Sequence, residues 1–206
     1  MESSKQTGVL NNAGFHSAWK STNSGLAGFF AVIILGVFPL VFRDYYFDIL
    51  NFKTFFYYKV VIIFAVVFLM VNVIFLILSI YLGCDRSTGR RRKICASDWS
   101  MLDFILIAGI STLQSATPAG ALLGNDGRYS GLLIWIAYAI MYFAVRRSLR
   151  LRQWYLDLFL GAGMGACIIG ILQYFDIDPI GFKNLMDPGQ YYMFTSTIGN
   201  INTYTS

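Results

Sequence analysis

The chain has 206 residues, of which 56% are hydrophobic and only 13% are charged, and its net charge is +5. Soluble domains are typically about 25% charged, so this composition excludes an ordinary soluble domain and predicts a surface that faces lipid. The positive charge is compatible with nucleic-acid binding, but the basic residues lie in short loops between apolar runs, which is their usual placement in membrane proteins. We therefore expect no nucleic-acid partner.

The pattern of apolar runs predicts an all-α, polytopic membrane protein with about five transmembrane helices. The expected spans, which together occupy residues 25–175, are 25–42, 58–82, 99–116, 129–145 and 154–175. Residues 1–24 are rich in Ser, Asn and Gly and are expected to form a flexible cytoplasmic tail. Residues 176–206 contain no complete span and are expected to form an extracytoplasmic segment that leads toward a further helix.

Several residues within or near these spans carry local predictions. Residues 43–57 are rich in Tyr and Phe and predict an interfacial segment, because such rings settle at the headgroup level. Asn72, in the second span, is expected to bond to a neighbouring helix. Asp98 is a candidate N-cap of the third span. Gly161 and Gly165 have the GxxxG spacing that permits close packing, so we expect the fifth span to be buried among other helices.

The distribution of Lys and Arg predicts the orientation, since cytoplasmic loops carry an excess of these residues. Eleven of the sixteen lie in the N-terminal tail and in the loops 83–99 and 146–152, and five lie on the opposite side. The N-terminus and these two loops are therefore predicted to be cytoplasmic, and the segment after Phe175 to be outside. Any chemistry of this chain is expected at the outer face.

The metal-binding residue types are sparse. The chain has three cysteines, Cys84, Cys95 and Cys167, and one histidine, His16. Three scattered cysteines are too few for a disulfide framework. The sequence contains neither a CxxC pair nor a cluster of Cys and His, so we expect no metal and no other cofactor.

The outer loop 117–128 holds the first candidate binding residue. Arg128 lies between Gly124 and Gly131. A guanidinium group fits phosphate or carboxylate and stays charged at any relevant pH, so Arg128 could hold a lipid-linked pyrophosphate at the headgroup level. The alternative is that Arg128 pairs with Asp126 or with an ordinary lipid phosphate.

Two other outer features also have alternative interpretations. The stretch TSTIGNIN, residues 195–202, includes Asn200 and Asn202 and could bond a sugar or a diphosphate, or it could be a capped turn that leads into another helix. Asp176 and Asp178 could act as an acid and base pair, or they could be ordinary solvated carboxylates in a turn.

The outer features resemble a known family when they are taken in order. The stretches are FPLVFRDYYFDILNFKTFFYYKV at 38–60, LLGNDGRYSGLL at 122–133, GILQYFDIDPIGF at 170–182 and STIGNINTYTS at 196–206. Their order and their spacing relative to the expected spans resemble the N-terminal half of the O-antigen ligase/polymerase family of bacterial envelope proteins. The resemblance covers nearly everything from Gly25 to Ser206.

The resemblance implies a glycosyltransferase of the cytoplasmic membrane that moves glycan from an undecaprenyl-diphosphate carrier to an acceptor at the outer face, without a metal. Its partners would be the lipid-linked glycan, the glycan acceptor and membrane lipid. The family's catalytic arginines and histidine lie in its later half, which we expect to be missing here, so catalytic residues in this chain are unknown. The positions that carry over, as carrier-binding and pocket-shaping residues, are Arg128, Gly124, Gly131, Asn200 and Asn202.

Two other functional classes are kept as alternatives. Half of a transporter or flippase would be expected to carry charged or broken helices near the bilayer midplane, and the second, fourth and fifth spans carry no such charges. A non-enzymatic membrane scaffold would pair through the face that contains Gly161 and Gly165.

Overall fold

The computed structural model of the chain describes residues 2–43, 49–83, 94–124, 129–179, 181 and 196–198. Its helices are α1 (Glu2–Val32), the π-helical turn η1 (Ile33–Val37), α2 (Ile49–Tyr81), α3 (Ala96–Leu113), α4 (Pro118–Leu123), α5 (Leu132–Ser148) and α6 (Gln153–Tyr174). None of the described residues forms a strand.

Four of the helical segments are long and apolar enough to cross a membrane: Ala13–Val37, Asn51–Tyr81, Ala96–Leu113 and Gln153–Tyr174. Large apolar side chains cover their outer surfaces, and on α2 the side chains of Leu69 and Ile80 are 65% and 73% exposed. Apolar helices with this degree of exposure suit lipid and not water. The predicted all-α membrane fold is thereby confirmed.

The fourth expected span, residues 129–145, corresponds to α5. This helix has 17 residues, which is about the shortest length that crosses the hydrocarbon core. Arg146 and Arg147 lie in its last turn, where cations also interact favourably with the negative end of the helix dipole.

α1 begins at Glu2 and not at Gly25, so the described residues that we expected to form a flexible tail are helical. In this first half the side chain of Phe15 packs against α2, where its ring lies 5.5 Å from the ring of Phe75. Short polar residues and glycine favour a helix only weakly. Contact with a partner helix therefore outweighs local preference here.

α2 also differs from its expected bounds, because it begins at Ile49. Residues 49–57 of the aromatic segment are therefore the first turns of a long helix and not a separate interfacial element. α2 has 33 residues, which correspond to about 50 Å. The hydrocarbon core is only about 30 Å thick, so α2 extends into the headgroup region.

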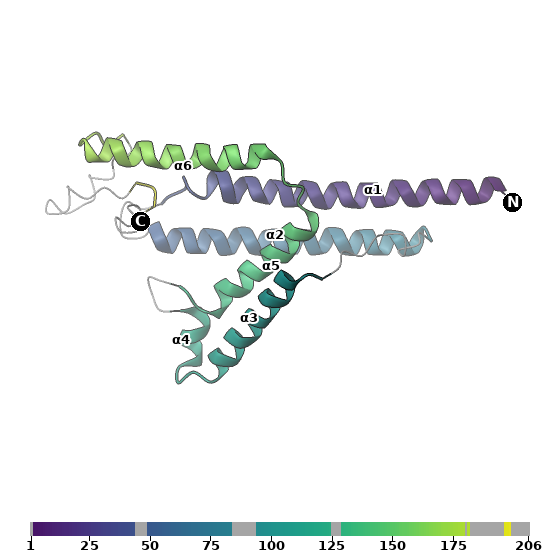
Figure 1. Ribbon diagram of the computed structural model, residues 1–206, viewed down its shortest axis with the longest axis horizontal. Helices are drawn as coiled ribbons and strands as arrows, with labels where there is room; N and C mark the ends of the chain where they lie inside the picture. The colour runs from purple at the N-terminus through teal and green to yellow at the C-terminus, as the bar shows by residue number, and fades with distance from the viewer. Residues whose placement is uncertain are drawn as a thin grey trace.

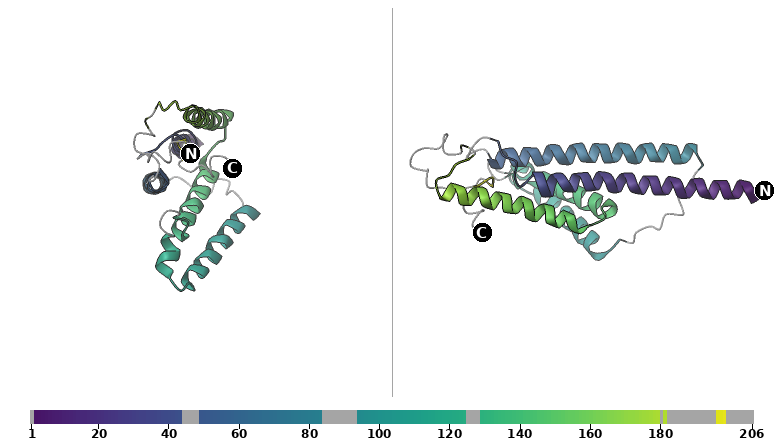
Figure 2. Two further views of the ribbon diagram at one scale, coloured as in Figure 1. Left: turned by 90° about the vertical axis from the view of Figure 1, so that its left-hand side faces the viewer. Right: turned by 90° about the horizontal axis from the view of Figure 1, so that it is seen from above.

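The helices form two groups in space. α1, α2 and α6 run lengthwise beside one another, whereas α3 and α5 form a pair that crosses them at an angle (Figures 1 and 2). α5 joins the two groups, because it packs against α1, α2 and α3. α6 packs against α1 and η1, and the N-terminal half of α1 extends well past the start of α6 (Figure 1).

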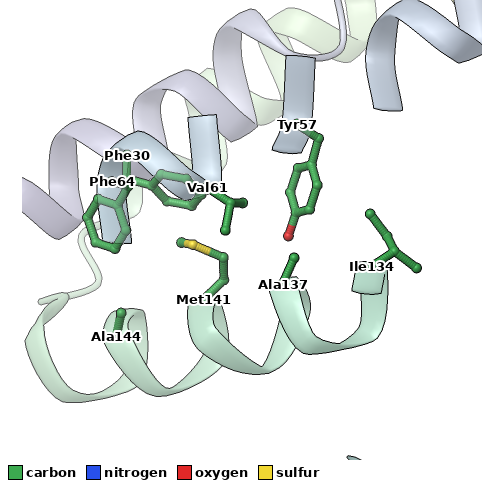
Figure 3. Close-up of a cluster of buried hydrophobic side chains, with 8 residues drawn as sticks. All are labelled: Phe30, Tyr57, Val61, Phe64, Ile134, Ala137, Met141 and Ala144. Atoms are coloured by element: carbon green, nitrogen blue, oxygen red, sulfur yellow. The ribbon is translucent and has the colours of Figure 1, made fainter. Parts of the chain in front are cut away.

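The main core lies where α1, α2 and α5 meet (Figure 3). Its buried members are Phe30, Tyr57, Val61, Phe64, Ile134, Ala137, Met141 and Ala144. The small residues Ala137 and Ala144 let α5 approach the aromatic side chains of the other two helices closely. The rings of Phe30 and Phe64 lie 4.7 Å apart in this core.

A polar contact joins α1 and α2 beyond the core. Asn72 Nδ2 donates to Asn23 Oδ1 at 2.9 Å, and Asn72 Oδ1 accepts from Trp19 Nε1 at 3.0 Å. The expected bond between Asn72 and a neighbouring helix is thus confirmed. Such contacts contribute about 0.6 kcal/mol on average in membrane proteins, so this one sets the pairing of the helices more than the total stability.

α6 packs on one side only. A Cβ on Gly165 would lie 3.3 Å from Leu40 Cδ2, whereas a Cβ on Gly161 would have no neighbour within 4 Å among the described residues. Leu160 and Met164 on α6 are more than 60% exposed. The expectation that this helix is buried among others is therefore wrong for the described part of the chain.

Candidate functional site

Two glycines close the base of the loop that carries Arg128. Gly124 has φ +85°, and a Cβ on it would lie 2.6 Å from the backbone N of Ser130. A Cβ on Gly131 would overlap the backbone N of Gly124 and the carbonyl of Leu122. Only glycine lets two backbone segments approach this closely. The structure therefore brings Gly124 and Gly131 together, and their contact closes the loop.

The other predicted binding residues lie outside the described part of the chain: Arg128, Asn200 and Asn202, together with Asp126. Tyr129, the described neighbour of Arg128, has its ring 5.7 Å from the ring of Phe55. This contact places the end of the Arg128 loop beside the first turns of α2.

The described part of the stretch TSTIGNIN, residues 196–198, is anchored to the helices. Ser196 N donates to Gln173 Oε1 at 2.8 Å, and Ser196 Oγ donates to the carbonyl of Ala166 at 2.5 Å. Thr197 Oγ1 donates to the carbonyl of Pro39 at 2.8 Å. Both Ser196 and Thr197 are fully buried. Their hydroxyl donors thus satisfy backbone carbonyls and are not presented to a ligand.

Lys53 is a candidate that the sequence analysis did not single out. Its side chain is only 9% exposed, its Nζ donates to the carbonyl of Pro39 at 3.1 Å, and the same Nζ lies 5.6 Å from the centre of the Phe38 ring. Among the described residues no carboxylate forms a salt bridge with it. Burial of a cation without a carboxylate is costly, and the Pro39 carbonyl and the Phe38 ring are the described groups that offset this cost.

The carbonyl that Lys53 and Thr197 share lies at the end of a disrupted helix. In η1 the bonding widens, and Phe38 N donates to the carbonyl of Ile33 at 2.8 Å. Pro39 has no N–H and cannot continue the helical ladder. Carbonyls at such an end lack helical donors and carry the negative end of the helix dipole, which explains why they attract an ammonium and a hydroxyl.

One carboxylate of the acidic turn after α6 has a structural role. Asp178 Oδ1 accepts from Gly181 N at 3.0 Å, as aspartates commonly do in turns. Asp176 adopts φ +61° at the end of the helix. The described geometry of Asp178 thus agrees with a turn-stabilising carboxylate.

A polar cluster lies where the N-terminus of α3 meets the C-terminal turns of α5, on the side predicted to be cytoplasmic. Asp98 forms an ion pair with Arg146 and accepts a hydrogen bond from Tyr142 Oη at 3.2 Å. Cys95 and not Asp98 is the N-cap of α3, and Asp98 Oδ2 accepts from Cys95 N at 3.1 Å. The N-cap prediction for Asp98 was therefore wrong by three residues, because a carboxylate at the third helical position reaches back to the cap N–H.

The thiol of Cys95 has two polar neighbours in this cluster. Cys95 Sγ lies 2.8 Å from Ser97 Oγ, and Arg146 Nη2 donates to the sulfur at 2.8 Å. The hydrogen bond with Ser97, reinforced by the positive charge of Arg146, lowers the pKa of the exposed Cys95 thiol.

Within the described ranges, no three side chains of His, Cys, Asp or Glu come together in a way that could hold a metal ion. Comparisons with protein-family models, curated proteins and solved structures found no match for this chain. Its functional interpretation therefore depends on its own residues and geometry.

Proposed function

We propose that this chain is the N-terminal part of a membrane glycan ligase or polymerase, and that its outer face binds the diphosphate of an undecaprenyl carrier in the cytoplasmic membrane. The observation that carries the proposal is the buried Lys53, which has no ion pair with a described carboxylate. A buried cation at this position supports an anionic ligand at the end of the bundle where Gly124 and Gly131 close the Arg128 loop.

The chemistry of a diphosphate suits this end of the bundle. Lys53 carries three N–H donors, and the Pro39 carbonyl accepts from its Nζ. Arg128 is the residue type that binds phosphate with two parallel hydrogen bonds. Together the two cations would hold the carrier and stabilise the diphosphate as the leaving group when glycan is transferred. The role that we propose for this chain is therefore carrier binding, and not the bond-making step.

Aromatic neighbours support the same location. The rings of Phe38, Tyr57 and Phe55 lie near the start of α2, and Phe55 contacts Tyr129. Amphipathic and aromatic rings are enriched at the headgroup level, where the diphosphate of a polyprenyl lipid also lies. A carrier bound here would place its isoprenoid chain in the bilayer and its glycan in the aqueous phase.

The test is the substitution Lys53→Met in the complete protein, which removes the charge and keeps an unbranched apolar side chain. Hydrogen bonds to charged groups contribute about 1.5–3 kcal/mol, so we expect affinity for undecaprenyl diphosphate to fall about tenfold or more. Titration of the carrier into nanodiscs measures this loss, and a transfer assay should show a parallel loss of activity.

Lys59→Met is the matched control, because Lys59 lies on the same helix and is exposed. It should keep nearly normal carrier affinity. Arg128→Ala should impair glycan transfer and leave expression intact. Wild-type carrier affinity in Lys53→Met would contradict the proposal, whether or not the thermal stability of that variant is lower.

One observation favours a second candidate function. The face of α6 around Gly161 is uncovered among the described residues, which suits a scaffold that pairs with another membrane helix. The transporter alternative gains no comparable support, because the polar groups of Asn23 and Asn72 bond to each other between α1 and α2.

A further inference from the structure

A groove of about 560 Å³ lies between α1 and the start of α6, at the end predicted to be cytoplasmic. The hydroxyl groups of α1 in its lining are those of Ser17, Ser21 and Ser24. These serines recur at intervals of four and three residues, so they share one face of the helix. The cations in the lining come from two separate parts of the chain and are Lys20, Arg150 and Arg152.

The groove exists because α6 covers only the C-terminal part of α1: it begins beside Gly28. Tyr155, near the start of α6, packs so closely on α1 that a Cβ on Gly28 would lie 2.6 Å from its hydroxyl oxygen. The part of α1 before Gly28 has α2 beside it, but it extends past the start of α6 (Figure 1). The serine face of α1 is therefore left uncovered, and the connection between α5 and α6 brings Arg150 and Arg152 to its edge.

The charges of the groove are of one sign. Its lining includes three cations and no Asp or Glu. Within the described part of the chain, Lys20, Arg150 and Arg152 form no salt bridge. Guanidinium and ammonium groups grouped in this way attract phosphate, and serine hydroxyls supply neutral donors to the same oxygens.

The lining changes from polar to apolar along α1. The serines are followed by Phe29 and Val32, which also line the groove. Trp154 lies at the start of α6 and is 44% exposed, as is typical of tryptophan at the headgroup level. This gradient matches a lipid, whose phosphate would lie at the serines and whose acyl chain would follow Phe29 and Val32. A soluble phosphate compound would make no use of the apolar part.

We propose that this groove binds one anionic phospholipid of the cytoplasmic leaflet, with its phosphate held by Lys20, Arg150 and Arg152. Basic pockets beside transmembrane helices on the cytoplasmic side are a recurring means of binding anionic headgroups. The site lies at the opposite end of the bundle from Lys53, and it does not depend on the proposed glycan transfer.

The experiment uses the full chain purified in detergent and titrated with phosphatidylglycerol or phosphatidylcholine, with bound lipid counted by native mass spectrometry. The wild-type chain should retain phosphatidylglycerol in preference to phosphatidylcholine. The double variant Arg150→Gln/Arg152→Gln should bind phosphatidylglycerol roughly thirtyfold more weakly, about fivefold for each cation removed. The control Lys59→Gln/Arg147→Gln removes the same charge from exposed positions outside the groove and should bind as the wild type does.

A second variant separates the shape of the groove from its charge. Gly25 lines the groove, and a Cβ there would meet nothing within 4 Å, so Gly25→Leu should fold normally and fill the groove with all three cations kept. We expect it to weaken phosphatidylglycerol binding several-fold.

Three results would overturn the proposal. They are a wild-type chain without preference for phosphatidylglycerol, equal losses in the Arg150→Gln/Arg152→Gln variant and its control, and full displacement of the lipid by an equal concentration of inorganic phosphate. The last result would assign the groove to a soluble anion.

Discussion

At the predicted outer end of the bundle, the hydroxyl groups of Ser196 and Thr197 are buried and donate to backbone carbonyls, whereas at the predicted inner end the cations of the α1–α6 groove are exposed. The outer end contains a disrupted helix, because η1 and Pro39 leave carbonyls without helical donors. The inner end contains an uncovered face of α1, because α6 begins only beside the C-terminal part of α1. Ser17 and Ser21 in the groove are exposed as well, so hydroxyl groups stabilise the fold at the outer end and are accessible at the inner end.

Lys53 is the exception at the outer end. It shares the Pro39 carbonyl with Thr197, yet it brings a full charge into a buried position. A neutral donor would satisfy that carbonyl at lower cost. No described carboxylate balances the charge of Lys53, which is why this residue carries the proposal of an anionic ligand.

The largest effect is expected where the outer loop is closed. Gly131→Ala would place a Cβ into the backbone of Leu122–Gly124, and overpacking of this kind costs about 3 kcal/mol when neither backbone can shift. The free energy of unfolding in mixed micelles should fall accordingly. Gly109→Ala is the control, since a Cβ there meets nothing within 4 Å, and it should stabilise α3 by up to about 1 kcal/mol. Equal effects of the two substitutions would show that the loop is not closed by backbone contact.

A smaller effect is expected at the inner polar cluster. Asp98→Asn would remove the charge that pairs with Arg146 and weaken the bond to the N-cap N–H. Because Arg146 is 30% exposed, solvent screens the pair, and we expect a loss of about 1–2 kcal/mol. Thermal unfolding in detergent measures this loss. Asp103→Asn, at an exposed position of the same helix, should change the stability little, and a comparable loss there would argue against a specific role of Asp98.

The smallest effect is a shift in the reactivity of Cys95. Its lowered pKa means that more thiolate is present at neutral pH than for an ordinary cysteine. Ser97→Ala removes the main cause, so the pKa should rise and the midpoint of the alkylation rate should move to higher pH. Iodoacetamide labelling followed by peptide mass spectrometry gives this profile. Ser100→Ala is the control, since Ser100 Oγ donates to the carbonyl of Ala96 and not to the thiol, and an unchanged midpoint in Ser97→Ala would contradict the assigned cause.

Features that depend on local composition were predicted well. The apolar runs predicted the membrane helices, and the amide side chain of Asn72 within an apolar span predicted a bond between helices. The structure brings the backbones of Gly124 and Gly131 together, whereas their predicted part in carrier binding stays a prediction. The resemblance to a glycan-transferring family stays a prediction, as do the roles of Arg128, Asn200 and Asn202.

Features that depend on long-range contact were missed. Lys53 was counted as one of several outer cations, because its burial arises from Pro39 and Phe38, fourteen and fifteen residues away along the chain. A lysine within a run of aromatic residues was the available signal. The groove on α1 was missed because Lys20 and Arg152 are more than a hundred residues apart.

The sequence by itself determined that this is an all-α membrane protein, because long apolar runs can satisfy their backbone hydrogen bonds in lipid only as helices, and that property is local. It also determined where most of the helices lie. Only the tertiary structure decided that the polar first half of α1 is helical, that Lys53 is buried and that a basic groove opens beside α6. Each of these depends on the point at which one helix ends relative to its neighbours, and packing between distant segments sets that relation.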